Sequence, residues 1–277
     1  MNAIRSALNP QFPAYATLAD KLGWWALRGL CVALLVFLLL PILVIVPLSF
    51  SSSSFLAYPM PGWSLQWYEN LFTAPEWGRA AKNSFIVAPA ATLVATVLGT
   101  LAAVGLARVD FPGKGLLMGV LIAPMVVPIV VVGVACYLLF AKVGLADSYL
   151  GLIVVHAALG APFVLTTVLA TLQGFNHNLV RASLSLGAGP VETFFRVTLP
   201  VIAPGVISGA LFAFATSFDE VVVTLFLAGP DQVTLPRQMF TGIRENISPT
   251  IAAVATLLTI FTTGLMLALE WIRGRRR

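Results

Sequence analysis

Six apolar stretches constrain the fold of this 277-residue chain more than any other feature of its sequence. Each contains at least the ~20 residues that a helix needs to cross a hydrocarbon core of about 30 Å. Backbone groups find no water partner in lipid, so segments of this length are expected to be helical. The sequence therefore predicts an all-α membrane protein with six transmembrane helices. The stretches are residues 25–50, 83–106, 116–140, 149–172, 201–228 and 250–271.

The charged residues support this class and indicate the topology. They make up 10% of the chain, whereas about a quarter is typical of soluble domains. Eleven Lys and Arg residues lie on the side that holds the N-terminus and five on the other, which places both termini in the cytoplasm. We divide the chain into a leader (1–24), a six-helix domain (25–272) and a basic tail (273–277). Because the basic residues are spread over short loops, no nucleic-acid partner is expected.

Several single residues in the spans have structural interpretations. Pro124 and Pro128 predict a bent or locally unwound third span. His156 is the one histidine in a predicted span, and we expect it to hydrogen-bond to a neighbouring helix rather than to relay protons. Cys31 and Cys136 both fall inside predicted spans, so neither a disulfide nor a metal site is expected.

Two pairs of glycines have the four-residue spacing that lets membrane helices approach closely. One pair is Gly115 and Gly119, and the other is Gly205 and Gly209. Such pairs are common in membrane helices, so we interpret both as packing sites.

The longest polar interval between two spans on the basic side covers residues 174–205. Asn178 is a suitable N-cap, and apolar residues then recur at helical spacing, so a short helix is expected to end at Gly187 or Gly189. Pro190 suits the first turn of a second short helix. The sequence predicts a compact knob of two helices joined at a glycine, although a merely solvated loop is an alternative.

This interval resembles the cytoplasmic signature of bacterial ATP-binding-cassette import permeases. The matching residues are Leu186, Gly187 and Ala188 at the Leu-Gly-Ala centre, and Leu199, Pro200, Pro204 and Gly205 at the Leu-Pro and Pro-Gly end. The Glu-Ala-Ala beginning differs, because Val180 and Arg181 stand near the place of the glutamate and only Ala182 is kept. The resemblance implies that segment 174–200 is the coupling helix that docks on an ATPase subunit. The residues implied for ATPase coupling are Arg181, Ala182, Ser183, Leu186, Gly187, Ala188, Leu199 and Pro200.

Asp219 and Glu220 are consecutive acids inside the fifth apolar stretch. Each costs about 2.5 to 3.5 kcal/mol at the centre of a bilayer on insertion scales. If the span is one helix, Thr216, Glu220 and Thr224 form one polar stripe at one-turn spacing. Three interpretations stay open. The acids hold helices together, form the relay of a secondary transporter, or line a passage in which carboxylates replace the water around an ammonium substrate.

The string SFDEVVVTLFLAGP around these acids resembles the polyamine (spermidine/putrescine) branch of the import permeases, in the second-permease type. The resemblance implies that Asp219, Glu220, Thr216 and Thr224 lie on the substrate path for polyamine cations. A related amine or an amino acid such as 4-aminobutyrate remains an alternative substrate. A stand-alone secondary carrier and a structural scaffold remain alternatives from other classes.

A short amphipathic helix is predicted between the fifth and sixth spans. Arg237, Phe240, Thr241 and Arg244 recur there at helical spacing after Pro236. The helix either lies at the membrane interface or, as the resemblance implies, contributes Arg237, Phe240 and Arg244 to an external gate or a binding-protein contact.

The resemblance as a whole implies one permease subunit of an ATP-driven importer in the bacterial cytoplasmic (inner) membrane. Its implied partners are a sister permease, two ATPase subunits, a periplasmic or extracellular substrate-binding protein and the lipid bilayer. ATP and Mg are expected to bind the partner ATPase. The chain itself is expected to hold no cofactor or metal, and its motifs supply no catalytic residues.

Overall fold

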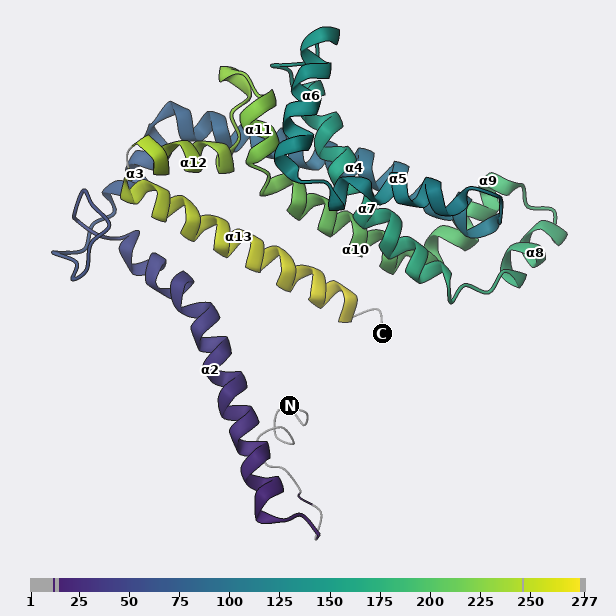
Figure 1. Ribbon diagram of the computed structural model, residues 1–277, viewed down its shortest axis with the longest axis horizontal. Coiled ribbons are helices and arrows are strands. Elements are labelled where there is room, and N and C mark those ends of the chain that lie inside the picture. The colour runs from purple at the N-terminus through teal and green to yellow at the C-terminus, as the bar shows by residue number, and fades with distance from the viewer. Residues whose placement is uncertain (1–11, 13–14, 246, 275–277) are drawn as a thin grey trace. The chain divides into compact units, whose positions relative to one another are not determined.

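Helices form nearly all of the regular structure in this computed structural model, which describes residues 12, 15–245 and 247–274 (Figure 1). In the described residues the only β pairing is one isolated bridge between Ser51 and Trp63. The predicted all-α class is confirmed. In chain order the helices are α2 (Leu18–Leu48), α3 (Gln66–Thr73), α4 (Pro75–Arg108), α5 (Lys114–Val126), α6 (Ile129–Val143), α7 (Tyr149–Leu172), α8 (Asn178–Ser185), α9 (Pro190–Thr193), the π-helical turn η1 (Phe194–Thr198), α10 (Leu199–Phe218), α11 (Val222–Leu227), the 3-10 turn η2 (Pro230–Gln232), α12 (Leu235–Glu245) and α13 (Pro249–Gly274).

The contacts divide the chain into two units, Glu69–Ile247 and a second unit made of the two ends of the chain. In the second unit α2 contacts α13. Helix α2 starts inside the predicted leader, because Thr17 and Asp20 form a capping box in which each side chain accepts a backbone N–H of the other residue. Residues 275–277 of the predicted tail lie outside the described part of the chain.

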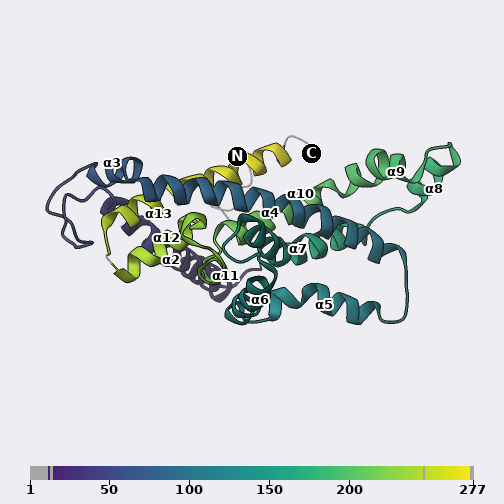
Figure 2. The ribbon, with the colours of Figure 1, turned by 90° about the horizontal axis from the view of Figure 1, so that it is seen from above.

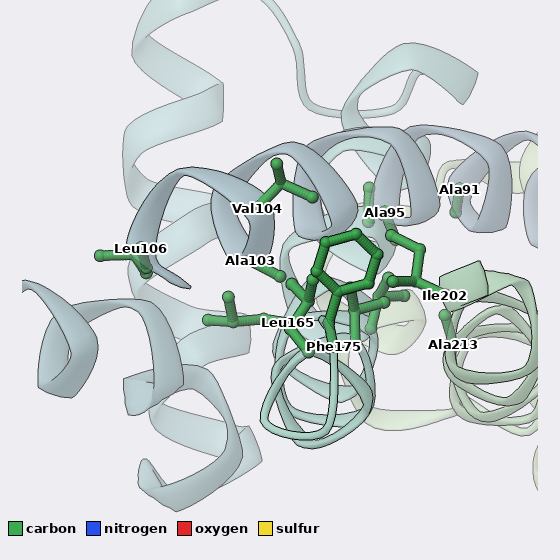
Figure 3. Close-up of a cluster of buried hydrophobic side chains, with 13 residues drawn as sticks. Ala91, Ala95, Ala103, Val104, Leu106, Leu165, Phe175, Ile202 and Ala213 are labelled. Atoms are coloured by element: carbon green, nitrogen blue, oxygen red, sulfur yellow. The ribbon is translucent and has the colours of Figure 1, made fainter. Parts of the chain in front are cut away.

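Helices α4, α7 and α10 form the core of the unit Glu69–Ile247. Small side chains of α4 pack against branched side chains of α7 and α10, which gives a cluster that is almost fully buried (Figure 3). Its labelled members on these helices are Ala91, Ala95, Ala103, Val104, Leu106, Leu165, Ile202 and Ala213. Within this unit α8 and α9 lie at one end of the core and α12 at the other (Figure 1).

The glycines of α10 explain how closely it approaches α7. A Cβ atom on Gly209 would lie 2.6 Å from the Cα atom of Val164, and one on Gly205 would collide with Thr171. The predicted packing role of this pair is confirmed. A Cβ atom on Gly115 or Gly119 would meet nothing within 4 Å, so the other pair makes no close approach inside this chain.

Four described helices are long and apolar enough to cross a membrane, and a bent pair raises the number to five. The four are Leu18–Leu48, Pro75–Arg108, Tyr149–Leu172 and Pro190–Phe218. The apolar part of α13, Pro249–Leu265, falls in a shorter class of 10 to 17 residues. Six spans therefore remain a prediction.

The bent pair is α5 and α6, which meet at an angle of 103° (Figures 1 and 2). Val127 has extended backbone angles (φ −69°, ψ 133°), as expected for a residue that precedes proline. Pro128 then stands at the N-cap of α6, where its missing N–H leaves no helical hydrogen bond unmade. The predicted bend of the third span is confirmed.

Candidate functional site

Asp219 and Glu220 lie in a break between two helices, and not inside one helix as expected. Helix α10 ends at Phe218, and α11 begins at Val222. The Glu220 carboxylate accepts the backbone N–H of Val223 at 2.8 Å, at the start of α11. A side-chain acceptor there replaces the backbone carbonyl that a continuous helix would supply, which favours a new helix start.

The predicted polar stripe along one helix is therefore wrong. Thr216 lies on α10, whereas Thr224 lies beyond the break on α11. Asp219 is exposed, Glu220 and Thr216 are half-buried, and Thr224 is fully buried. Among the described residues neither acid forms an ion pair. The hydrogen bond of Glu220 stabilises its own following helix and does not join two spans.

His156 of α7 contacts both sides of this break. Its side chain is almost completely buried, with 1% exposed. Nδ1 lies 2.9 Å from Ser217 Oγ in the last turn of α10, and Nε2 lies 3.3 Å from Thr224 Oγ1 in α11. The prediction that this histidine hydrogen-bonds to a neighbouring segment is confirmed. Its contact with both α10 and α11 was not predicted, because residues 201–228 were expected to form one unbroken helix.

The C-terminal end of α11 is held by two further contacts. The Leu227 carbonyl accepts the backbone N–H of Asp147 at 3.0 Å. The Arg237 guanidinium donates to the Ala228 carbonyl at 2.5 Å and so satisfies the end of the helix. Burial lowers the pKa of Arg237, and the nearby Asp147 carboxylate opposes this shift. Helix α11 is thus tied at both ends.

Helix α12 confirms the predicted amphipathic helix but separates its three candidate residues. Arg237 is half-buried, and its guanidinium bonds to backbone of the same chain. Phe240 and Arg244 are exposed. Only these two of the three are free for an external contact.

A clamp that we did not predict fixes the loop between α11 and α12. The buried Asn83 amide of α4 donates to the carbonyls of Asp231 and Val233, both at 2.8 Å. The Tyr149 hydroxyl donates to Asn83 Oδ1 at 2.7 Å, and Ser84 Oγ accepts the backbone N–H of residue 235 at 2.8 Å. The signal in the sequence was a pair of consecutive polar residues at the start of an apolar stretch.

The coupling segment has the predicted form, two short helices joined at a glycine. Gly187 has φ +89°, a left-handed conformation that favours glycine, and Pro190 opens α9. Ser183 Oγ lies 2.9 Å from Thr193 Oγ1 and joins the two helices. The predicted Asn178 cap is wrong. Asn178 is the first residue of α8, and the Asn176 side chain accepts its backbone N–H at 3.0 Å.

The candidate ATPase-coupling residues lie mostly on the surface of this segment. Leu186 is 88% exposed, so nearly its whole apolar side chain lies on the surface. The other exposed candidates are Arg181, Ala182, Gly187 and Pro200, and the half-buried ones are Ser183, Ala188 and Leu199. A cavity of about 330 Å³ next to α8 is lined by Arg108, His177, Arg181 and Thr198 together with apolar side chains.

One continuous helix connects the coupling segment to the break. Residues Pro190–Phe218 run without interruption from α9 through the π-helical turn η1 into α10. An ion pair of 2.8 Å between Arg196 and Glu192 supports its first turns. The coupling segment lies at the N-terminal end of this helix, and Asp219 and Glu220 follow its C-terminal end.

Comparisons of sequence and of fold relate the chain to known proteins. The profile of the family described as "Binding-protein-dependent transport system inner membrane component" matches residues 95–276. The spermidine/putrescine transport system permease protein PotC of Haemophilus influenzae is 32% identical over 236 residues, which are 85% of this chain and 91% of that protein. The putrescine transport system permease protein PotI of Escherichia coli is 35% identical over 229 residues, or 80% and 81% of the two chains.

Solved structures share the fold. A chain of a bacterial ABC transporter involved in the import of the acidic polysaccharide alginate has a TM-score of 0.74 and 13% identity, with 95% of this chain and 99% of that chain covered. A chain of the bacterial alginate transporter in complex with a pentasaccharide-bound periplasmic protein has a TM-score of 0.67 and 19% identity, with 91% and 92% covered. At these identities the likeness concerns the fold alone.

Proposed function

The chain belongs to the family of binding-protein-dependent transport system inner membrane components, and from that membership we propose that it carries polyamine cations across the membrane. It is a multi-pass permease subunit of an ABC importer, with ATP hydrolysis assigned to a separate subunit. The proposed cargo is a putrescine-like or spermidine-like cation, as in the relatives that match over most of the chain. The translocation path is proposed to form between this chain and a sister permease.

The observation that carries the cargo proposal is the break at Asp219 and Glu220. Broken helices at membrane depth commonly line a cavity and supply its ligand groups. A carboxylate in a wet cavity attracts an ammonium group without trapping it, which passage requires. Asp219 is exposed in this chain, and Glu220 is half-buried beside it. We assign both acids to the substrate path, with Thr216 as a neighbour on α10.

The proposed energy input comes through the coupling segment. The exposed Leu186 and its neighbours are suited to a groove of an ATPase subunit, which would hold ATP and Mg. The cavity beside α8 carries Arg108 and Arg181, whose charge favours an acidic side chain of that partner. Arg181 thus carries a positive charge near the position where the family signature has a negatively charged glutamate. We also propose that the complete importer contains two ATPase subunits. Both termini of this chain are proposed to lie in the cytoplasm.

On the opposite end of the unit, Phe240 and Arg244 of α12 are proposed to contact a substrate-binding protein. Their exposure supports this role. Arg237 and the Asn83 clamp would hold α12 in position.

The test is transport by the complete complex in vesicles, with Asp219→Asn and Glu220→Gln variants. Each substitution keeps the shape and removes a charge, so we expect putrescine uptake to fall by about tenfold or more at unchanged subunit assembly. Asp231→Asn removes an equally acidic side chain outside the break and serves as the control. Unchanged uptake in both break variants would reject the path.

Two further arms of the same experiment separate the alternatives. ATP hydrolysis stimulated by 4-aminobutyrate but not by putrescine or spermidine would move the cargo to amino acids. Putrescine uptake by this chain alone, driven by an ion gradient without ATP, would identify a secondary carrier and overturn the proposal.

A further inference from the structure

The break that carries Asp219 and Glu220 is bridged by one side chain from another helix. We propose that His156 is the positioning residue that sets α10 and α11 relative to each other and thereby places the two carboxylates. We also infer that its contact with Thr224 opens and closes as α10 moves during transport. This inference rests on the proposed function for its effect on cargo, and on the hydrogen bonds alone for its effect on geometry.

The surroundings of His156 leave the imidazole little freedom. Only 1% of its surface is exposed, and Leu152 and Val155 of the same helix are also buried. One turn further along α7, a Cβ atom on Gly160 would lie 3.0 Å from the Cβ atom of Ala213 of α10, so the two helices are in close contact there. The ring is therefore held against the last turns of α10.

The two hydrogen bonds form a chain with a consistent direction. One tautomer satisfies every contact: the Thr224 hydroxyl donates to the Glu220 carbonyl at 3.3 Å and accepts from the Nε2–H group of His156. In that tautomer Nδ1 accepts from the Ser217 hydroxyl, at 2.9 Å. The network thus runs from the end of α10 through α7 to the backbone of Glu220. A substitution at His156 would disturb the carboxylate position without touching the acid itself.

The two sides of the break differ in what they are attached to. Helix α10 continues to Pro190 in the coupling segment, so displacement there is transmitted to Phe218. Helix α11 is instead tied at its C-terminal end to Asp147 and Arg237. Movement of α10 against α11 must therefore act on the joint at 219–221 and on the bridge across it. The longer bond, 3.3 Å to Thr224, is the one that we expect to open.

The experiment uses the complete complex with ATPase, sister permease and binding protein. His156→Leu removes both hydrogen bonds, His156→Asn retains an amide near the Nδ1 position, and His156→Gln retains one near Nε2. We expect His156→Leu to raise the KM of putrescine-stimulated ATP hydrolysis by about tenfold and to change kcat by less than about twofold, with partial rescue by the amides. A role in folding alone would lower the yield of complex and leave its KM unchanged.

Smaller substitutions keep the test valid if His156 variants fail to fold. Thr224→Val removes one hydroxyl at nearly constant volume, and Thr224→Ser retains it as the matched control. We expect a rise in KM of about threefold for Thr224→Val and none for Thr224→Ser. In the His156→Leu background Thr224→Val should raise KM by less than it does alone, because the bond to His156 is already absent and only the contact with the Glu220 carbonyl is lost. Fully additive effects of Thr224→Val and His156→Leu on KM would overturn the proposed bridge.

A distance measurement separates this inference from the proposed function. Spin labels at the exposed positions 215 on α10 and 226 on α11, with Cys31 and Cys136 replaced by serine, report the relation of the two helices without any substrate. We expect one narrow distance population in the parent complex and a broadened one in His156→Leu. If Asp219→Asn and Glu220→Gln both leave uptake unchanged while the distances broaden in His156→Leu, the cargo proposal fails and the bridge stands. Unchanged distances in His156→Leu would overturn the bridge.

Discussion

The break between α5 and α6 and the break between α10 and α11 interrupt two apolar segments by different means. At the first, Val127 is extended because a proline follows it, and the chain turns by 103°. At the second there is no proline between Phe218 and Val222. The Glu220 side chain caps the new helix, and His156 holds both sides from a neighbouring helix.

The two breaks therefore depend on different parts of the molecule. The first starts from the backbone restriction that Pro128 places on Val127, and packing of α6 on α11 then holds the resulting angle. The second consists of hydrogen bonds that can open and form again at modest free-energy cost, about 0.5 to 1.5 kcal/mol each. We expect the break between α5 and α6 to keep its geometry during transport and the break between α10 and α11 to change its geometry.

The largest effect is expected where α10 is pressed against α7. Gly209→Val places a Cβ atom 2.6 Å from the Cα atom of Val164, so we expect a loss of about 3 kcal/mol in unfolding free energy, measured by thermal melting in detergent. Gly119→Val on α5 is the matched control, because nothing in this chain lies within 4 Å of that position. Equal losses in both variants would contradict the difference in packing between these helices.

The next effect concerns the cap of α11. Glu220→Ala removes the acceptor for the Val223 N–H and the charge together, whereas Glu220→Gln removes only the charge. We expect Ala to lower the unfolding free energy by about 1 kcal/mol more than Gln, as for other lost caps. Both should impair putrescine uptake. A stability of Glu220→Ala equal to that of Glu220→Gln would show that the carboxylate does not sustain the break.

A smaller effect is expected at the first break. Pro128→Ala gives the unfolded chain more conformational freedom and should lower the unfolding free energy by about 0.5 to 1 kcal/mol. The bend itself should persist because α6 packs on α11. We expect the KM of putrescine-stimulated ATP hydrolysis to stay unchanged. A shift in this KM comparable to that of Thr224→Val would remove the distinction between the two breaks.

The smallest effect is expected in the turn that precedes α5. The Lys114 ammonium donates to Asp110 at 2.7 Å, and this contact lowers the pKa of Asp110 below its ordinary value of 3.8. A lowered pKa contributes stability above the unfolded-state pKa, and this contribution is lost as the pH falls through the folded-state pKa. Asp110→Asn should therefore be slightly less stable at neutral pH and equally stable in strongly acidic buffer. Melting temperatures at both pH values provide the check, and uptake at neutral pH should be unaffected.

Local chemistry made part of the fold predictable. The predicted fourth span has the same bounds as α7, Tyr149–Leu172, since Ser148 caps it and the apolar run ends with it. The bend at Pro128 and the glycine joint at Gly187 followed from backbone restrictions that belong to those residue types. The Asn178 cap was wrong because Asn176, two residues earlier, supplies the acceptor. Sequence spacing alone does not separate such neighbouring cap candidates.

The candidate site was only partly predictable. Asp219 and Glu220 were identified by their charge in an apolar stretch, whereas the break around them depends on His156, which is 64 positions from Glu220 in sequence. The Asn83 clamp likewise joins residues about 150 positions apart. Contacts of this kind arise only when α4, α7 and α10 pack together. Periodicity along a single segment carries no information about them.

The unbroken helix Pro190–Phe218 also fixes a rotational phase between its two ends. Each residue turns a helix by about 100°, so one inserted or deleted residue would swing the last turn of α10 to a different side while leaving the first turn in place. Exchanging this knob for that of another permease would therefore require conserving the number of residues up to Phe218, and not merely their type.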